Sequence, residues 1–204
     1  MSTILVTGGA GYIGAHVVDT LIESGFDVIV LDNLSNGYRE NLNQKAQFLS
    51  SDIRLVSELD SVFLNHKIDS VIHLATLKSV SDSAKNPWSY TQTNILGSLN
   101  LISTAIKYKV KNFIFSSTAA VYGAPQFNPV NEQHPTNPIN HYGFTKLYIE
   151  NYLTWISKIE SLNFISLRYF NAAGYTFKED LIKYREKKPE NLLPIVMEVA
   201  VGER

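Results

Sequence analysis

Residues 3–32 read TILVTGGAGYIGAHVVDTLIESGFDVIVLD, and this stretch decides the fold class. The apolar run Thr3–Val6 stops at a glycine turn, and Tyr12–Glu23 then carries apolar residues at helical spacing. Gly25 ends that helix, and Asp27–Asp32 is an apolar run too continuous for a strand with one exposed face. The stretch therefore predicts a strand, a helix and a second, parallel strand in a sheet that is covered on both faces.

The same alternation continues along the chain. Apolar runs predict further strands at Phe48–Leu49, Ser70–Leu74, Asn112–Ser116 and Phe164–Leu167. Helical spacing predicts helices over Leu55–Asn65, Trp88–Tyr108 and Gly143–Ile159, and from Pro189 toward Arg204. A proline-rich loop follows the strand Asn112–Ser116, at the edge where such sheets place active sites. We therefore expect an α/β fold with a doubly wound parallel sheet of the Rossmann type.

Composition limits the possible partners and the compartment. The 204 residues suit one sizeable domain, and a net charge of −1 with 18% charged residues favours neither nucleic acid nor an acidic membrane surface. The chain has no cysteine, which excludes disulfides and thiolate sites and is typical of a reducing compartment. No secretory signal or transmembrane span is visible, so we expect a cytoplasmic protein. The five histidines have no metal-binding spacing, so no metal site is expected and His73 is assigned to the core.

A dinucleotide site is predicted at the first strand-to-helix turn. Gly8, Gly11 and Gly14 form a G-x-x-G-x-x-G run, which lets the backbone turn tightly and approach a pyrophosphate. Asp32 closes the second strand about 20 residues later, where a carboxylate accepts hydrogen bonds from the adenosine ribose and repels the extra phosphate of NADP. We therefore expect NAD. The structural alternative is that Asp32 and Asn33 only form a turn after the strand.

Two further segments extend this prediction along the sheet. Asp52 and Ile53 follow the third strand, where they would hold the adenine between a hydrogen-bond acceptor and an apolar wall; a helix N-cap is the alternative. Leu74, Ala75 and Thr76 end the fourth strand with groups small enough for a cofactor to pass close to the backbone. Their alternative is an ordinary strand end.

A catalytic group is predicted on the second half of the sheet. Tyr142 and Lys146 are four residues apart at the start of a helix, so they share a face. Ser116, Ser117 and Thr118 lie at the carboxyl end of a strand, where a hydroxyl would complete a proton-transfer group. A tyrosine with a pKa near ~10 needs a nearby positive charge to act as a base at neutral pH, and Lys146 would supply it. Without the dinucleotide site, the pair would be a half-buried ring and a solvated lysine.

Eight collinear segments carry a family resemblance: VTGGAGYIG at 6–14, DNLSNG at 32–37, DIR at 52–54, HLATLKSV at 73–80, FSSTAAVYG at 115–123, YGFTK at 142–146, RYFNAAG at 168–174 and NLLP at 191–194. Together they resemble UDP-glucose 4-epimerases of the extended short-chain dehydrogenase/reductase group. The resemblance implies that residues 1–174 form the NAD-binding domain. Residues 175–204 would begin a substrate-binding region that the family continues well past Arg204, so the sequence looks truncated.

The resemblance also implies a mechanism. Tyr142 takes the proton of the sugar 4-hydroxyl while bound NAD⁺ oxidises C4, and reduction of the rotated 4-keto sugar on its other face interconverts UDP-glucose and UDP-galactose. Lys146 lowers the tyrosine pKa and holds the nicotinamide ribose, and Thr118 orients or shuttles the proton. Further implied cofactor contacts are Tyr12, Ile13, Leu34, Ser35, Asn36, Gly37, Lys78, Asn94 and Phe170, besides Thr118, Tyr142 and Lys146. The implied UDP-sugar contacts are Lys78, Thr118, Tyr142, Asn171, Asn191 and Leu192.

Departures from the family pattern leave alternatives open. Thr118 stands where many relatives have serine, and Thr76 replaces a common glycine and would crowd the cofactor. A nucleotide-sugar dehydratase ranks below an epimerase, because Ala119-Ala120 follow Thr118 and cannot transfer protons. A reductase of the same group, or an NAD-binding protein without turnover, remains an alternative. Relatives also imply a homodimer through the two long helices, although their apolar residues fit packing on the sheet equally well.

Overall fold

The structure is a computed structural model that describes residues 2–172, 184, 195, 196, 199, 200 and 202. Within these residues six strands form one sheet in the order β3-β2-β1-β4-β5-β6, and every neighbouring pair is parallel. The strands are β1 (Thr3–Thr7), β2 (Asp27–Asp32), β3 (Gln47–Ser50), β4 (Ser70–His73), β5 (Asn112–Thr118) and β6 (Asn163–Tyr169). The order reverses between β1 and β4, which confirms the expected doubly wound α/β fold.

The helices are α1 (Tyr12–Glu23), α2 (Val56–Asn65), α3 (Val80–Lys85), α4 (Pro87–Tyr90), α5 (Ser98–Lys107) and α6 (His141–Ile156). The long helix expected over Trp88–Tyr108 is made of α4, a π-helical stretch at Thr91–Gly97, and α5. Helix α6 begins two residues before its expected start, because the Asn140 side chain accepts a hydrogen bond of 2.8 Å from the backbone N–H of Gly143 and caps it.

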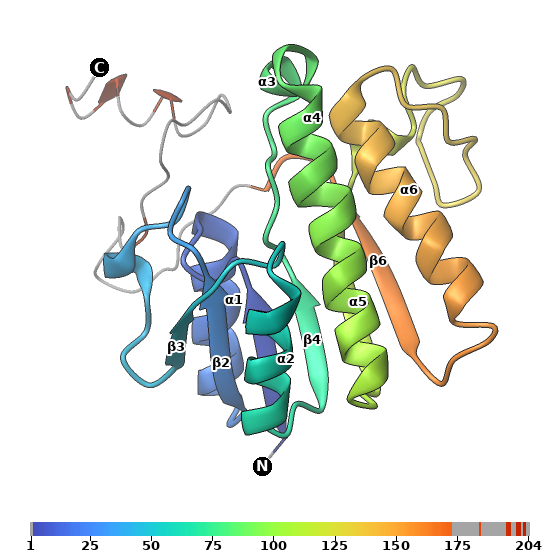
Figure 1. The fold of residues 1–204 in the computed structure, drawn as a ribbon. Coiled ribbons are helices and arrows are strands. Elements are labelled where there is room, and N and C mark those ends of the chain that lie inside the picture. The colour runs from blue at the N-terminus through green and yellow to red at the C-terminus, as the bar shows by residue number, and fades with distance from the viewer. Residues whose placement is uncertain (1, 173–183, 185–194, 197–198, 201, 203–204) are drawn as a thin grey trace.

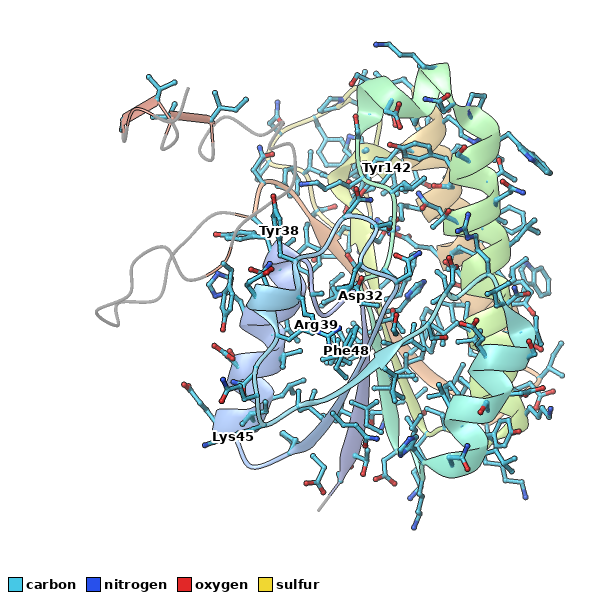
Figure 2. The ribbon with its side chains drawn as sticks, turned by 60° about the vertical axis from the view of Figure 1, so that its left-hand side comes forward. Asp32, Tyr38, Arg39, Lys45, Phe48 and Tyr142 are labelled. Carbon is cyan, nitrogen blue, oxygen red and sulfur yellow. The ribbon has the colours of Figure 1, made fainter. Side chains whose placement is uncertain are left out.

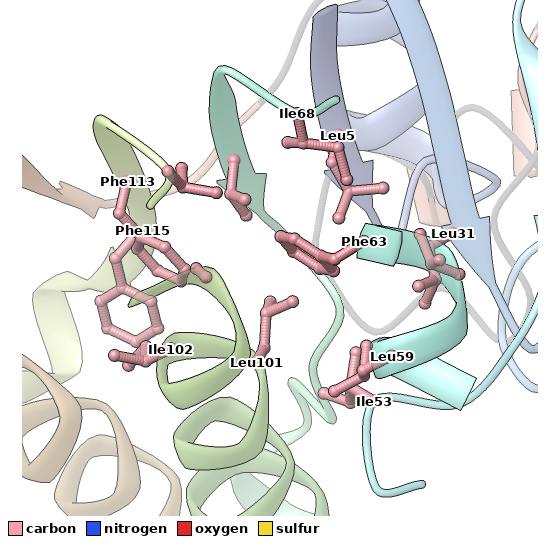
Figure 3. Packing of buried hydrophobic residues seen from close by; sticks show 14 of the residues in the cluster. Leu5, Leu31, Ile53, Leu59, Phe63, Ile68, Leu101, Ile102, Phe113 and Phe115 are labelled. Carbon is pink, nitrogen blue, oxygen red and sulfur yellow. The ribbon is translucent and has the colours of Figure 1, made fainter. Parts of the chain in front are cut away.

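The two faces of the sheet are covered unequally (Figure 1). Helices α2, α5 and α6 pack on one face through a large apolar cluster that includes Leu59, Leu101 and Ile149, part of which Figure 3 shows. Helix α1 packs on the other face over β1 and β2, with Val18 in a smaller cluster. Covering on both faces explains the continuous apolar run of β2, in which every residue after Asp27 is buried.

His73 lies in the core, as expected. It is buried between Thr7, whose hydroxyl is 2.7 Å from Nδ1, and Ser98, whose hydroxyl is 2.8 Å from Nε2. Burial lowers the pKa of His73 to about 3, so the ring is neutral. It therefore ties β1, β4 and α5 together and takes no part in the site described below.

The described residues include little of the predicted C-terminal region. Asn191, Leu192, the domain boundary at 174 and most of the helix expected from Pro189 lie outside the described residues. In the part of the chain that is described, no helix is both long and apolar enough to cross a membrane.

Candidate active site

The carboxyl ends of the strands surround a cleft of about 970 Å³. It opens at the point where the strand order reverses, between the residues that follow β1 and those that follow β4. Twenty of the predicted site residues line it: Gly8, Gly11, Tyr12, Ile13, Gly14, Asp32, Asn33, Ser35, Asn36, Gly37, Asp52, Ile53, Leu74, Ala75, Thr76, Lys78, Thr118, Tyr142, Phe170 and Asn171. Segments that are far apart in the sequence thus form one continuous surface.

The glycine turn is packed too tightly for side chains. Gly8 has a φ of +76°, and a Cβ atom there would lie 2.6 Å from the backbone nitrogen of Ala75. A Cβ atom on Gly14 would lie 2.7 Å from the Cα atom of Gly9 and would overlap the carbonyl oxygen of Gly8. The two glycines therefore let α1 and β4 approach the turn closely, and bare backbone faces the cleft.

Asp32 holds the turn after β2 and also lines the cleft. Its carboxylate accepts hydrogen bonds from the backbone N–H groups of Ala10, at 3.1 Å, and Leu34, at 2.8 Å. These contacts hold the turn after β2, in which Leu34 has a φ of +57° and does not line the cleft. Asp32 itself lines the cleft with 8% of its surface exposed, so it also offers a carboxylate to a ligand. Figure 2 shows Asp32 on β2 and Tyr142 on α6.

Asp52 is held by its neighbours at the edge of the cleft. Its carboxylate pairs with Arg54 at 2.7 Å and accepts a hydrogen bond of 2.9 Å from the Asn33 side chain. These contacts, chiefly the hydrogen bonds from Arg54, lower the pKa of Asp52 to about 2. Asp52 is therefore an ionised acceptor in a fixed position beside Ile53.

Tyr142 and Thr118 meet in the cleft, although 24 positions separate them. Gly143 allows this approach, because a Cβ atom there would lie 2.6 Å from the carbonyl oxygen of Ala120. Burial raises the pKa of Tyr142, and a hydrogen bond with the Thr118 side chain opposes that rise. Strand β5 continues two residues beyond the predicted end, so Thr118 is its last residue.

Lys146 lies one helical turn from Tyr142 and is 2% exposed. Its Nζ atom donates a hydrogen bond of 2.9 Å to the backbone carbonyl oxygen of Ser116 and lies 5.9 Å from the centre of the Tyr142 ring. Burial lowers the pKa of Lys146 to about 7, against an upward effect of the Glu150 charge. Lys146 does not line the cleft and lies behind Tyr142 and Ser116, which do.

Asn94 also lies behind the surface of the cleft. Its amide side chain exchanges hydrogen bonds with the backbone of Leu77, both at 2.9 Å, and donates to the Thr145 hydroxyl at 3.2 Å. It therefore holds the segment after β4 against α6. Asn94 lies in the π-helical stretch, a local departure from α-helical geometry of a kind that is frequent at functional sites.

Several lining residues were not predicted from the sequence. Helix α3 and the residue that caps it contribute Ser79, Val80, Ser81, Asp82 and Lys85, and Tyr169 contributes from β6. The sequence carried a signal for α3, since Ser79-Val-Ser-Asp82 has the spacing of a capping box and the Ser79 hydroxyl accepts a hydrogen bond from the Asp82 N–H at 3.1 Å. The proline-rich loop is not part of the lining, which includes no residue between Ala120 and Tyr142.

Known proteins resemble the chain over its whole length. A UDP-glucose 4-epimerase from Halalkalibacterium halodurans is 45% identical over 98% of this chain and 60% of its own length. A solved UDP-glucose 4-epimerase from Bifidobacterium longum, in complex with NAD⁺ and UDP, is 38% identical with a TM-score of 0.94, covering 100% of this chain and 63% of its own. One from Brucella ovis, in complex with NAD, is 33% identical with a TM-score of 0.95, covering 100% and 62%.

The chain thus spans about 60% of the length of the relatives that it matches. A match to a protein family covers almost all of it, from residue 4 to residue 202. That region contains the glycine turn, the switch-point cleft and the adjoining Thr118, Tyr142 and Lys146. The chain therefore belongs to the NAD dependent epimerase/dehydratase family.

Proposed function

We propose that this chain binds NAD and inverts C4 of a UDP-hexose, interconverting UDP-glucose and UDP-galactose through a 4-keto sugar. The observation that carries the proposal is the contact of Tyr142 with Thr118 in the same cleft as the glycine turn. The names of the relatives agree with it, since those compared above are UDP-glucose 4-epimerases.

The residues of the cleft fit a dinucleotide. The turn at Gly8 and Gly14 leaves backbone exposed to a pyrophosphate at the start of α1, where amide groups and the helix dipole favour negative charge. Asp32 would accept hydrogen bonds from the adenosine ribose and repel a 2′-phosphate, which favours NAD over NADP. Asp52 and Ile53 would border the adenine. Thr76 lines the same cleft, and its side chain would narrow the path of the cofactor after β4.

The role of the chain's own residues is to accept the proton of the sugar 4-hydroxyl and to return it. A bound nicotinamide dinucleotide would supply the reversible two-electron oxidation of the sugar carbon. Tyr142 would take the proton of the 4-hydroxyl and later return it, and Thr118 would orient that proton through its hydroxyl. The Lys146 ammonium, 5.9 Å from the Tyr142 ring centre, would favour the phenolate from behind the surface of the cleft. Its burial behind Ser116 keeps this charge away from water.

The proposal assigns the rest of the chain as follows. Residues 1–174 form the NAD-binding domain, and residues 175–204 begin the region that binds the UDP-sugar. Asn171, exposed at the cleft beyond β6, and Lys78 would contact the sugar nucleotide, as would Asn191 and Leu192. A dehydratase is disfavoured, because Ala120, which lines the cleft after Thr118, has no group that transfers a proton.

A homodimer is part of the proposal. Large apolar side chains are exposed on the helices that cover the second half of the sheet: Trp88 on α4, Leu96 on the π-helical stretch, and Phe144, Tyr148 and Trp155 on α6. Figure 1 shows α5 and α6 side by side on the outside of the molecule. Exposed apolar groups concentrated in this way favour contact with another protein surface, here a second copy of the chain.

The test is a coupled assay of the purified chain with UDP-galactose and NAD⁺ that measures the UDP-glucose formed. We expect product with the parent chain and with Tyr108→Phe, a matched change at the end of α5 outside the cleft. With Tyr142→Phe we expect a loss of about 100-fold or more. Bound NAD without turnover in the parent chain would instead identify a dinucleotide-binding protein.

A further inference from the structure

Three residues of α6 form one face that contacts three successive residues of β5. Tyr142, Lys146 and Glu150 are spaced four residues apart, so they lie along the same side of the helix. Tyr142 contacts the Thr118 side chain, and Lys146 donates a hydrogen bond to the carbonyl oxygen of Ser116. The third contact joins the Ser117 hydroxyl to the carboxylate of Glu150. The catalytic pair thus has a third member, to which the proposed chemistry assigns no role.

Glu150 is a buried carboxylate held from two sides. The residue is 6% exposed. Arg168 on β6 pairs with it in a bidentate manner, with Nε 3.1 Å from both carboxylate oxygens and Nη2 2.6 Å from Oε2. Arg168 is itself fixed, because its guanidinium lies 4.8 Å from the centre of the Tyr122 ring. A carboxylate that accepts hydrogen bonds from these partners is held in one position.

Few titratable groups surround Lys146 among the described residues. Tyr142 and Glu150 face it from α6, Arg168 lies beyond Glu150 on β6, and the buried ring of His73 approaches from β4. Lys146 also lies 4.9 Å from the centre of the Phe115 ring, which carries no charge. Among these groups Glu150 is the one whose charge raises the pKa of Lys146, against the lowering effect of burial.

We propose that Glu150 is a positioning residue for Lys146: its clamped carboxylate favours the charged form of the buried amine and holds this face of α6 in register with β5. The inference rests on the proposed function, because Lys146 matters only if Tyr142 works as a proton acceptor. Arg168 and Ser117 act one step further away, by fixing the carboxylate. Without this carboxylate, burial would move the loss of the Lys146 proton to still lower pH.

The test follows the protonation of Lys146 directly, without substrate. The chain is labelled with ¹³C at the lysine ε-carbons, the Lys146 signal is identified by its absence in Lys146→Met, and its chemical shift is followed across pH by NMR. We expect a midpoint near 7 in the parent chain. In Glu150→Gln the midpoint falls by about one pH unit, since an opposite charge close by accounts for a change of that order. Glu160→Gln, the same change at an exposed position after α6, should leave it in place.

A second variant keeps the outcome interpretable. Glu150→Gln leaves the Arg168 cation without its buried partner, which can itself unfold the chain. Glu150→Gln combined with Arg168→Met replaces the whole pair with neutral side chains, and the midpoint should fall in the same direction. A folded double variant with an unchanged Lys146 midpoint overturns the proposal. Failure of this variant to fold also counts against it, because the pair would then be a requirement of the fold itself.

Turnover separates the inference from the function on which it rests. In the UDP-galactose assay, Glu150→Gln should move the alkaline decline of kcat to lower pH by the same amount, with KM changed by no more than about twofold. If the parent chain shows no turnover but Glu150→Gln still lowers the Lys146 midpoint, the role of Glu150 is supported and the epimerase is rejected. Turnover with identical pH profiles in both proteins would reject the role of Glu150 and keep the epimerase.

Discussion

The ammonium nitrogen of Lys146 lies 2.9 Å from the backbone carbonyl oxygen of Ser116, so a charged group of α6 is held against the end of β5 with almost no access to water. Burial lowers the pKa of this lysine to about 7, whereas an unfolded chain holds the proton up to about 10.5. Burial of the charged Lys146 side chain therefore lowers the free energy of unfolding at and below neutral pH.

The first prediction concerns stability against pH. Because the unfolded chain binds this proton more tightly than the native chain, the contribution of Lys146 makes the free energy of unfolding rise as pH rises from about 7 toward 10.5. Lys146→Met should lack this contribution and be more stable at about pH 7 by roughly 2 kcal/mol. Urea denaturation at about pH 7 and pH 9 measures both effects. Lys45→Met, at an exposed position, serves as the control; equal pH slopes for Lys146→Met and the parent chain would contradict the prediction.

The second prediction compares two glycines of the same turn. Gly14→Ala places a Cβ atom 2.7 Å from Gly9 Cα and should destabilise the fold by about 3 kcal/mol or more, because backbone must move. Gly11→Ala meets only the Gly8 carbonyl oxygen, at 3.3 Å, so its loss should be much smaller. Thermal unfolding of the two variants provides the comparison. Equal melting temperatures would show that α1 does not need its close approach to the turn.

The third prediction concerns the hydroxyl beside Tyr142. Thr118→Ser keeps the hydroxyl and should retain activity within about threefold, whereas Thr118→Val keeps the shape and should lose about 100-fold in kcat. The coupled UDP-galactose assay gives both values. Thr104→Val, which removes a buried hydroxyl from α5, is the matched control. Full activity of Thr118→Val would remove Thr118 from the mechanism.

The fourth prediction concerns self-association. Trp155 is 67% exposed on α6, and Trp155→Glu should convert a dimer into a monomer, because it places a charge in the apolar contact. Leu64→Glu changes a residue that is 74% exposed on α2, on a different part of the surface, and should leave the dimer intact. Sedimentation at several concentrations distinguishes the two. A parent chain that stays monomeric at the highest concentration would exclude this interface.

Much of the fold follows from local pattern. The bounds expected for the first helix and the second strand match α1 and β2, because a glycine turn and a run of apolar residues are signals contained in a few neighbouring positions. The end of β5 was missed by two residues, since Ser117 and Thr118 are polar and join the sheet only through pairing with Arg168 and Tyr169. Helix α3 was missed because it has only six residues, too few to show a periodic pattern.

The sequence by itself determined the alternation of strands and helices, the glycine turn before α1, the carboxylate that ends β2 and the four-residue spacing of Tyr142 and Lys146. Only the tertiary structure decided that Thr118 contacts Tyr142, that Asn94 and Lys146 lie behind the cleft and not on its surface, and that Glu150 is clamped by Arg168 and Ser117. The physical reason is the separation along the sequence over which each kind of interaction acts. Backbone preference and hydrophobic periodicity act between near neighbours, whereas burial, pKa and the pairing of charges depend on which distant segments are packed together.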